Sequence, residues 1–253
     1  MAHSLGYLVA KVFERRDPLG TRRLRRVGRA RAPVLHFLFA LAAFFSPAAA
    51  QPAPQPLRFT VFSARPIAGL AFVPRAGAPQ QKLVFYPTAR SPRYEFRGAM
   101  PVRFVDEATN AVVAEATIPP GMREAFLLFA PIAAATPGGL RYQISVLDDG
   151  AARHGPGGLV IVNLSGLELS GTVGNVPVAL KAGLNPTLAL GPATKIALRT
   201  GSKNRSYQSY AGTIDLKRNQ RALLLLFPPF YQGSLEVQSR LLLDEVAGAS
   251  AGR

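Results

Sequence analysis

The sequence predicts an all-β protein: two similar β-sandwich (Ig-like) units in tandem, behind an N-terminal signal segment. The chain has 253 residues, 48% of them hydrophobic, and its 22 Pro and 23 Gly interrupt the apolar segments at short spacing. This composition suits many short strands. No stretch of ten or more residues has helical periodicity without a Gly or Pro inside it. Several segments of the first half also recur, in order, about 95 to 102 residues later.

The strands predicted in the first unit follow one another at short spacing. Each is an alternating or continuous apolar run that ends at turn-forming residues such as Gly, Pro, Asp or Asn. These strands cover residues 57–63, 67–74, 82–87, 101–107, 111–119, 125–131 and 140–149.

The last strand of each half shows the two-residue period of a strand with one buried and one solvated face. In the first half the predicted buried series is Leu140, Tyr142, Ile144 and Val146, with Arg141, Gln143 and Ser145 outside. In the second half it is Leu235, Val237, Leu241 and Leu243, with Glu236, Gln238 and Arg240 outside. Both strands are therefore expected to border a core on one side.

The two halves match segment by segment. The matching pairs are 60–72 with 162–174, 102–107 with 196–201, 112–118 with 207–214, and 123–150 with 221–245. The period suits a duplicated β domain, with unit 1 at 57–149, a Gly-rich hinge at 150–157, unit 2 at 158–247 and a tail at 248–253. Shared patterning without duplication is the alternative.

Residues 1–50 have the pattern of a secretory signal peptide. A basic region precedes an apolar run at 33–45, and the small residues Ala48 and Ala50 follow, which predicts cleavage after Ala50. A Pro-rich tether at 51–56 comes next. The apolar run is shorter than the about 20 residues that a membrane span needs, so an uncleaved anchor is the minor alternative. The protein is therefore expected to be exported, periplasmic or extracellular, with membrane contact only through this segment if it is uncleaved.

The charge is strongly positive and cysteine is absent. The formal net charge is +16, and nine of the 30 basic and two of the 14 acidic residues lie in residues 1–50, which leaves +9 for the remainder. Such a charge favours an anionic polysaccharide or envelope surface, although proteins are also possible partners and nucleic acid is not expected for an exported chain. Without cysteine, disulfide scaffolds, thiolate metal sites and thiol catalysis are excluded.

Catalytic motifs are sparse. His154 is the single histidine after the signal segment, and in a Gly-rich hinge it is expected to be a solvated linker residue. Acidic pairs occur at 106–107, 148–149 and 244–245, and we interpret them as solvated strand ends and turns. No serine-hydrolase elbow, phosphate-binding loop or calcium loop occurs in the sequence. We expect no cofactor, no metal and no enzymatic activity, with a hydrolase as the weakest alternative.

Two segments interleave arginines with aromatic residues and are the candidate ligand-binding loops. Guanidinium groups bind phosphate, sulfate or carboxylate, and aromatic faces stack on sugars. The candidate residues are Arg90, Arg93, Tyr94 and Arg97 in the first loop and Arg199, Lys203, Arg205 and Tyr207 in the second. The alternative is that Tyr94 and Phe96 are core residues of a strand whose arginines form the solvated face.

Two short motifs support a family resemblance. A Y-x-[YF]-x-G segment lies at Tyr94, Phe96 and Gly98, and a P-G-G…NLS segment begins at Pro156 and ends at Ser165. With these motifs the chain resembles a family of uncharacterised exported bacterial β-sandwich proteins. The resemblance implies secretion and a β fold, and it implies no activity. We therefore expect a non-enzymatic, envelope-associated structural or protein-interaction module, or alternatively a binding module for anionic glycan or lipid headgroups.

Overall fold

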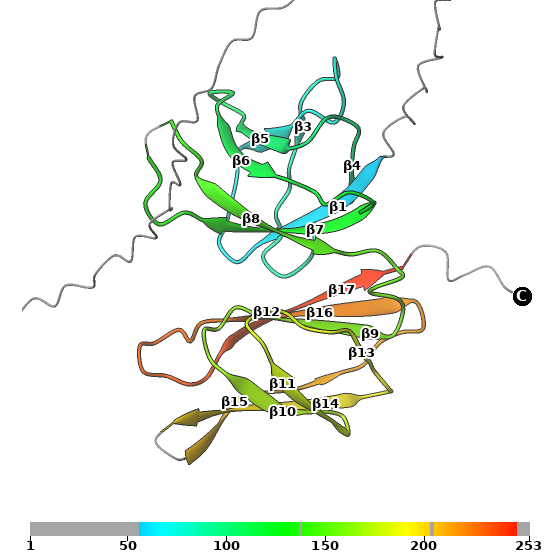
Figure 1. The fold of residues 1–253 in the computed structure, drawn as a ribbon, viewed down its shortest axis with the longest axis vertical. Helices are drawn as coiled ribbons and strands as arrows, with labels where there is room; N and C mark the ends of the chain where they lie inside the picture. The colour runs from blue at the N-terminus through cyan, green and yellow to red at the C-terminus, as the bar shows by residue number, and fades with distance from the viewer. Residues whose placement is uncertain (1–55, 137, 203–204, 247–253) are drawn as a thin grey trace, which may run out of the picture. The chain divides into compact units, whose positions relative to one another are not determined.

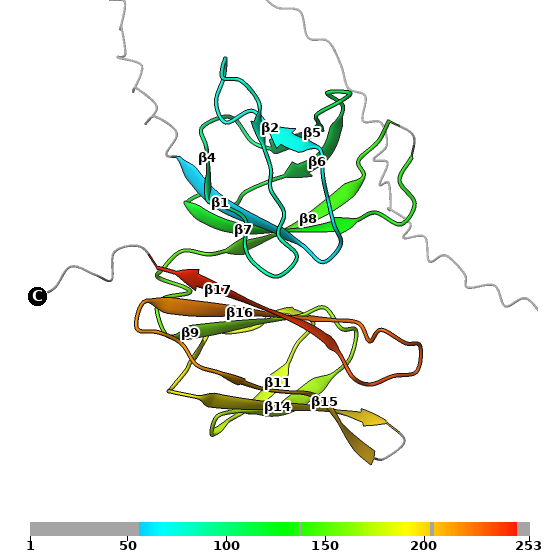
Figure 2. The same ribbon diagram turned by 180° about the vertical axis from the view of Figure 1, so that it is seen from behind.

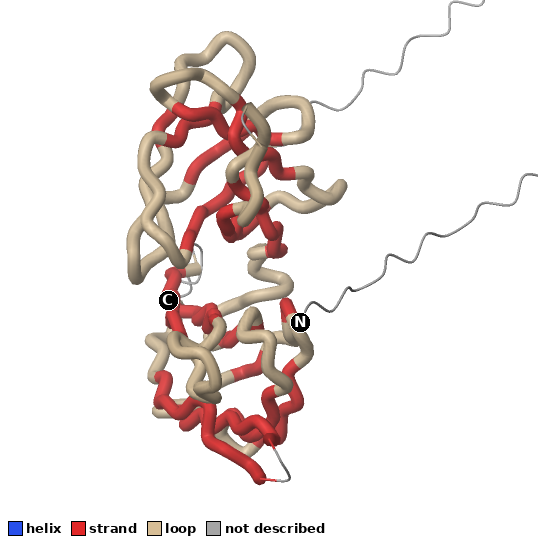
Figure 3. The backbone as a smooth tube through the Cα atoms, turned by 90° about the vertical axis from the view of Figure 1, so that its left-hand side faces the viewer, coloured by secondary structure: helices blue, strands red, loops and turns tan. Residues whose placement is uncertain are grey.

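The computed structural model describes residues 56–136, 138–202 and 205–246, all of which belong to one compact unit (Figure 1). These residues form 17 strands joined by loops, without any helix, which confirms the all-β prediction (Figure 3). The predicted signal segment with Ala48 and Ala50, residues 51–55 of the tether, Lys203 and the tail lie outside the described residues. In the described part of the chain, no helix could cross a membrane.

Lobe 1 (residues 57–149) is a sandwich of two four-stranded sheets. Inner sheet 1 has the order β4-β1-β7-β8, and outer sheet 1 has the order β3-β2-β5-β6. The inner strands are β1 (Leu57–Ser63), β4 (Tyr94–Phe96), β7 (Glu124–Pro131) and β8 (Tyr142–Asp148). The outer strands are β2 (Leu70–Phe72), β3 (Gln81–Lys82), β5 (Val102–Asp106) and β6 (Val112–Ala116).

Lobe 2 (residues 158–246) is a second sandwich (Figure 2). Inner sheet 2 has the order β12-β9-β16-β17, with β13 also paired to β9, and outer sheet 2 has the order β11-β10-β14-β15. The inner strands are β9 (Gly158–Asn163), β12 (Gly183–Leu184), β13 (Leu188–Ala189), β16 (Gln220–Phe227) and β17 (Gln238–Glu245). The outer strands are β10 (Leu169–Val173), β11 (Val176–Leu180), β14 (Thr194–Ser202) and β15 (Arg205–Ile214).

The two lobes have the same sheet topology, which confirms two similar sandwiches in tandem. In each lobe the first strand pairs in parallel with the penultimate one: β1 with β7, and β9 with β16. The penultimate strand then pairs antiparallel with the last. The sequence segments that match between the halves occupy equivalent strands, such as β5 with β14 and β6 with β15. Gene duplication as the origin of this likeness stays a prediction.

Gly69 and Gly171 occupy equivalent positions in the two halves, but glycine is needed at each for a different reason. Gly69 has a φ of +68°, a backbone conformation that glycine adopts without strain. Gly171 lies in β10, where a Cβ would overlap the carbonyl oxygen of Ala197 on the paired strand β14. Both positions therefore favour glycine, the first for backbone conformation and the second for the close approach of a neighbouring strand.

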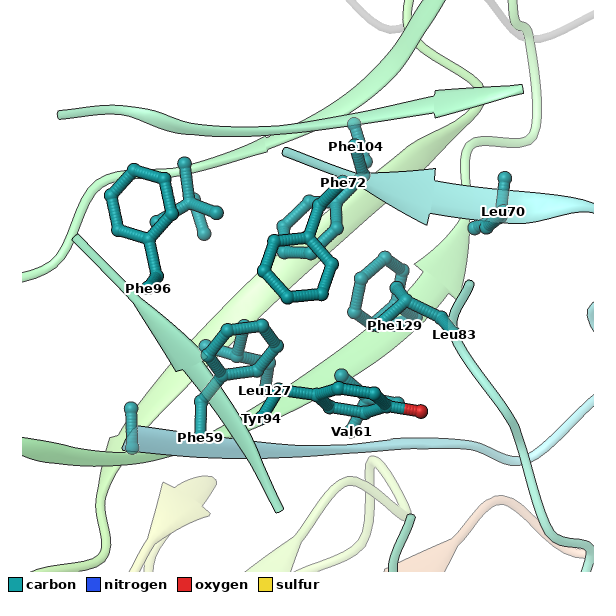
Figure 4. Packing of buried hydrophobic residues seen from close by; sticks show 14 of the residues in the cluster. Phe59, Val61, Leu70, Phe72, Leu83, Tyr94, Phe96, Phe104, Leu127 and Phe129 are labelled. Carbon is teal, nitrogen blue, oxygen red and sulfur yellow. The ribbon is translucent and has the colours of Figure 1, made fainter. Parts of the chain in front are cut away.

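Each lobe has its own apolar core between its two sheets. In lobe 1 the core is rich in phenylalanine, and the rings of Phe59, Phe72, Phe104 and Phe129 converge between the sheets (Figure 4). Phe104 and Phe129 meet edge to face, with ring centroids 5.1 Å apart. In lobe 2 aliphatic side chains such as Leu224 take the place of these rings.

A third core lies between the two inner sheets. One buried apolar cluster contains side chains from both inner sheets. Its members are Phe62, Phe126, Leu128 and Leu147 of inner sheet 1 and Val160, Val162, Leu223, Leu225 and Leu242 of inner sheet 2. The central strands β1, β7, β9 and β16 are therefore buried on both faces, as the continuous apolar runs of β7, β9 and β16 require. Outer sheet 1, inner sheet 1, inner sheet 2 and outer sheet 2 thus form four successive layers.

This third core corrects the strand-face prediction for β17. Leu242 is fully buried between the inner sheets, whereas Leu243, predicted to be buried, is 44% exposed. Leu242 is buried because inner sheet 1 covers the face of β17 that the prediction assigned to water. Leu243, on the other face, was wrongly predicted to be buried. The predicted strand at 82–87 was also too long, since β3 ends at Lys82 and the chain continues as a loop.

Candidate functional site

A buried network of charged side chains lies beside the third core, and Arg221 is its centre. Arg221 is 1% exposed and stands in β16, immediately before the apolar run of that strand. Its Nε donates to Asp244 Oδ2 at 2.9 Å, and its Nη2 donates to Asp244 Oδ2 at 2.6 Å and Asp149 Oδ2 at 2.8 Å. Its Nη1 donates to the backbone oxygens of Asp149 and His154. Every N–H of the guanidinium therefore has an acceptor.

Arg90 joins this network from the loop before β4. Ser91 exchanges hydrogen bonds with the backbone of Val61 in β1, which fixes the position of Arg90 against inner sheet 1. Arg90 Nη1 donates to Asp149 Oδ2 at 2.5 Å, and the guanidinium lies 5.1 Å from the ring centroid of Phe126. Its side chain is only 4% exposed. Arg90, predicted as a ligand-binding residue, is therefore not accessible to an external ligand.

His154 is also buried, at 2% exposure, so its interpretation as a solvated linker residue was wrong. Its Nε2 lies 3.0 Å from the carbonyl oxygen of Ala222, and because a carbonyl only accepts, Nε2 donates this hydrogen bond. Its Nδ1 faces Asp149 Oδ1 at 3.4 Å. The Nε2 contact thus holds the linker against β16, and the Nδ1 contact joins His154 to Asp149. Sequence periodicity could not reveal this, because the contacts are tertiary.

The carboxyl of Asp149 is held ionised by this network. Burial alone would raise its pKa, but the His154 contact and the charges of Arg90 and Arg221 outweigh burial and lower the pKa below the usual aspartate value. The two guanidinium contacts, at 2.5 and 2.8 Å, are closer than the histidine contact at 3.4 Å. Asp149 is therefore a buried, ionised bridge between Arg90 of lobe 1 and Arg221 of lobe 2.

The lowered pKa of Asp149 predicts a loss of stability in acid. A carboxyl whose pKa is lower in the folded than in the unfolded chain stabilises the fold above its unfolded value, about 3.9, and loses this contribution as pH falls through the folded pKa. The free energy of unfolding should therefore decrease as the pH falls below the unfolded pKa of about 3.9. Urea denaturation at a series of pH values measures this decrease. Asp149→Asn should be less stable at neutral pH and show a weaker acid dependence. An unchanged acid dependence in Asp149→Asn would contradict this role.

The three acidic pairs differ from the solvated strand ends that the sequence predicts. Asp149 and Asp244 have buried partners, whereas Asp148 stays partly exposed beside Arg153. Asp106 accepts a hydrogen bond from Arg141, which lowers the pKa of its carboxyl. The solvated interpretation is therefore wrong for Asp149 and Asp244, because both carboxylates pair with the buried Arg221.

The first basic-aromatic loop follows the alternative of a strand with one core face. Tyr94 is buried in β4, its hydroxyl accepts the Val84 N–H at 2.8 Å, and burial raises the pKa of its phenol. Tyr94 is therefore a core residue, not a ligand-binding one. Arg93 and Arg97 lie on the other face of β4, where they pair with Asp244 and Glu95.

The remaining candidates are exposed but are not gathered into one site. Arg93 and Arg97 line a groove of about 560 Å³ in lobe 1 together with Arg75. Arg199, Arg205 and Tyr207 are exposed on the β14–β15 hairpin of outer sheet 2 in lobe 2. The two loops thus belong to different sheets, and binding of an anionic glycan or lipid headgroup through them stays a prediction.

The aromatic tip, Phe230 and Tyr231, is the most exposed apolar feature of the described residues. Phe230 is 74% and Tyr231 72% exposed, while every other large apolar side chain among them is at 53% or below. Their rings meet edge to face with centroids 4.9 Å apart. They lie in the loop between β16 and β17, which projects beyond the strands of its sheet in Figure 1.

The base of this loop is anchored although its tip is open to solvent. Val237 is buried in the lobe 2 core, and its N–H donates to the carbonyl of Ser209 in β15. Gln238 donates from its side-chain amide to the Pro228 carbonyl at 2.8 Å. Gly233, with a φ of +84°, permits the turn beyond the tip. In the sequence, the feature that marks this loop is the aromatic pair between Pro229 and Gly233. Strand periodicity does not detect the pair, because it lies outside the strands.

No protein-family model matches the chain, and neither does any curated protein. Within residues 56–136, 138–202 and 205–246, no group of three or more His, Cys, Asp or Glu side chains could hold a metal ion.

Proposed function

We propose that the protein is an exported, non-enzymatic module that binds another protein through Phe230 and Tyr231. The observation that carries this proposal is the exposure of both rings on an anchored loop. Aromatic side chains supply large contact areas at little conformational cost and dominate the energetics of many interfaces. A folded protein gains nothing from leaving two adjacent rings in water, so their exposure favours a role in recognition.

The scaffold behind the tip supports the same function. The two sandwiches are joined through the third apolar core and the Arg221 network. This packed scaffold positions the loop that contains Phe230 and Tyr231. Binding sites on loops that a stable scaffold positions lose less conformational entropy when a partner binds. Export rests on the signal pattern of residues 1–50, and the partner is accordingly sought among envelope proteins.

Site-specific photo-cross-linking tests this proposal. A photoreactive phenylalanine analogue at Gln232, next to the tip, should give an adduct of defined mass with an envelope protein or with a second copy of the chain. The adduct should disappear in the Phe230→Ser/Tyr231→Ser background, because the rings supply the contact. The same analogue at Tyr207, which is 39% exposed in the same lobe, should give no such adduct. N-terminal sequencing of the cross-linked chain should begin at Gln51.

Two results would reject the assignment of the tip. The first is the absence of any adduct at Gln232 in cells that export the chain. The second is an adduct that persists unchanged when both rings are replaced by serine, since the contact would then belong to another surface.

A further inference from the structure

A cavity of about 570 Å³ opens beside the charged network, where both inner sheets and the linker meet. Its floor is formed by four residues of the third core: Phe126, Leu147, Val160 and Leu223. Cavities of this size accommodate small organic ligands, and they occur preferentially where domains meet. The cavity lies apart from the aromatic tip, because neither Phe230 nor Tyr231 lines it.

One wall of the cavity presents an exposed leucine that no core contact explains. Leu184 of β12 lines the cavity and is 53% exposed, more than any other aliphatic side chain that the structure describes. Leu147 and Val160 line the same cavity and keep 7% and 6% of their surface exposed. A ligand with an apolar body would cover all three side chains and remove this apolar surface from water.

The wall is held in place by Asn185, which is buried. Its Oδ1 accepts the Lys181 N–H at 2.9 Å, and its Nδ2 donates to the carbonyls of Lys181, Gly183 and Ile161. Thr187 ties the same segment to the linker by donating to the Arg153 carbonyl at 2.7 Å. The position of Leu184 is thus fixed before a ligand arrives, which reduces the entropy lost on binding.

The charges that line the cavity favour an anion. Asp149 is neutralised by Arg90 and Arg221, and Asp148 lies 3.3 Å from Arg153. The Lys181 ammonium is exposed and has no ion-pair partner among the described residues. The cavity therefore combines an apolar floor with one lysine in its lining that has no ion-pair partner among the described residues.

We infer that this cavity binds a small amphipathic anion, with its apolar body against Leu147, Val160 and Leu184 and its acidic head at Lys181. Ligands of this class include medium-chain and aromatic carboxylates. The cavity would give the protein a second binding function, independent of the aromatic tip.

The fluorescent carboxylate 11-(dansylamino)undecanoic acid is the probe for this inference. The wild-type chain should bind it saturably, and decanoate should displace it while decyltrimethylammonium should not. Lys181→Glu should weaken binding about tenfold, since it replaces an attractive charge by a repulsive one at a solvent-screened site. Lys195→Glu, the matched control on β14, should bind as the wild type does, because Lys195 is exposed outside the cavity.

Two further variants separate the cavity from other apolar surfaces. Leu184→Ser should also weaken binding, and circular dichroism checks that each variant is folded. Phe230→Ser/Tyr231→Ser should leave probe binding unchanged, so that failure of this inference is distinguishable from failure of the proposed function. The inference is overturned if the wild type does not bind saturably, if decyltrimethylammonium competes as well as decanoate, or if Lys181→Glu and Lys195→Glu behave alike.

Discussion

Arg221→Met should lower the free energy of unfolding by about 3–5 kcal/mol, the cost of removing one partner of a buried ion pair. Arg221 is 1% exposed, and its removal leaves the carboxyl groups of Asp149 and Asp244 with fewer donors inside the protein. Methionine keeps much of the side-chain volume, so the loss reports charge and hydrogen bonding and not a cavity. Urea denaturation followed by circular dichroism measures the effect.

Arg218→Met is the matched control for this prediction, because Arg218 is exposed three residues before Arg221. Its effect should stay within about 0.5 kcal/mol. Adding Asp244→Asn to Arg221→Met should recover part of the loss, since it removes one of the carboxylates left without its guanidinium partner. Equal destabilisation by Arg218→Met and Arg221→Met would show that the buried network contributes nothing special to the fold.

Phe104→Ala should destabilise the protein by about 3–5 kcal/mol through the cavity it leaves in lobe 1. Phe104 has no exposed surface, and its ring centroid lies 5.1 Å from that of Phe129 and 6.1 Å from that of Phe59. Because the ring packs against both sheets of the sandwich, its neighbours cannot fill the space without moving the strands. The decrease in the urea midpoint measures this effect.

Two substitutions calibrate the Phe104 prediction. Phe104→Leu should cost less, about 1.5 kcal/mol, since it keeps most of the apolar volume. Phe230→Ala removes the same ring from the exposed tip and should change stability by no more than about 0.5 kcal/mol. A Phe104→Ala protein as stable as Phe230→Ala would mean that the aromatic core is not packed as described.

The fold class and most strands could be predicted from sequence because they depend on local patterns. Residues 57–63 form β1 as predicted, and Tyr142, Ile144 and Val146 of β8 face the lobe 1 core. Leu140, predicted in the same buried series, precedes β8 and is 39% exposed. The apolar runs of β7 and β16 contained a further signal, since a strand without alternation is buried on both faces. That signal indicates a third core, but it does not identify which sheet packs against the second face of β7 or β16.

The charged network could not be predicted, because it joins residues far apart in the chain. Arg90 and Asp149 are 59 positions apart, and Arg221 and Asp149 are 72 apart. Alternation assigns a residue to a face of a strand and says nothing about what lies against that face. An arginine at the start of a fully buried apolar run, such as Arg221, is the local sign of a buried ion pair. For Phe230 and Tyr231 the sign was an aromatic pair in a turn.

The third core should couple the two lobes into one cooperative unit, and unfolding followed with one probe in each lobe measures this coupling. The chain has no Trp, so Tyr142→Trp in lobe 1 or Tyr210→Trp in lobe 2 gives each lobe its own fluorescent probe. With Phe104→Ala added, both probes should report one urea transition, shifted to the same lower midpoint. A Tyr210→Trp probe that keeps its original midpoint while the Tyr142→Trp probe moves would show that the lobes unfold independently and contradict the coupling.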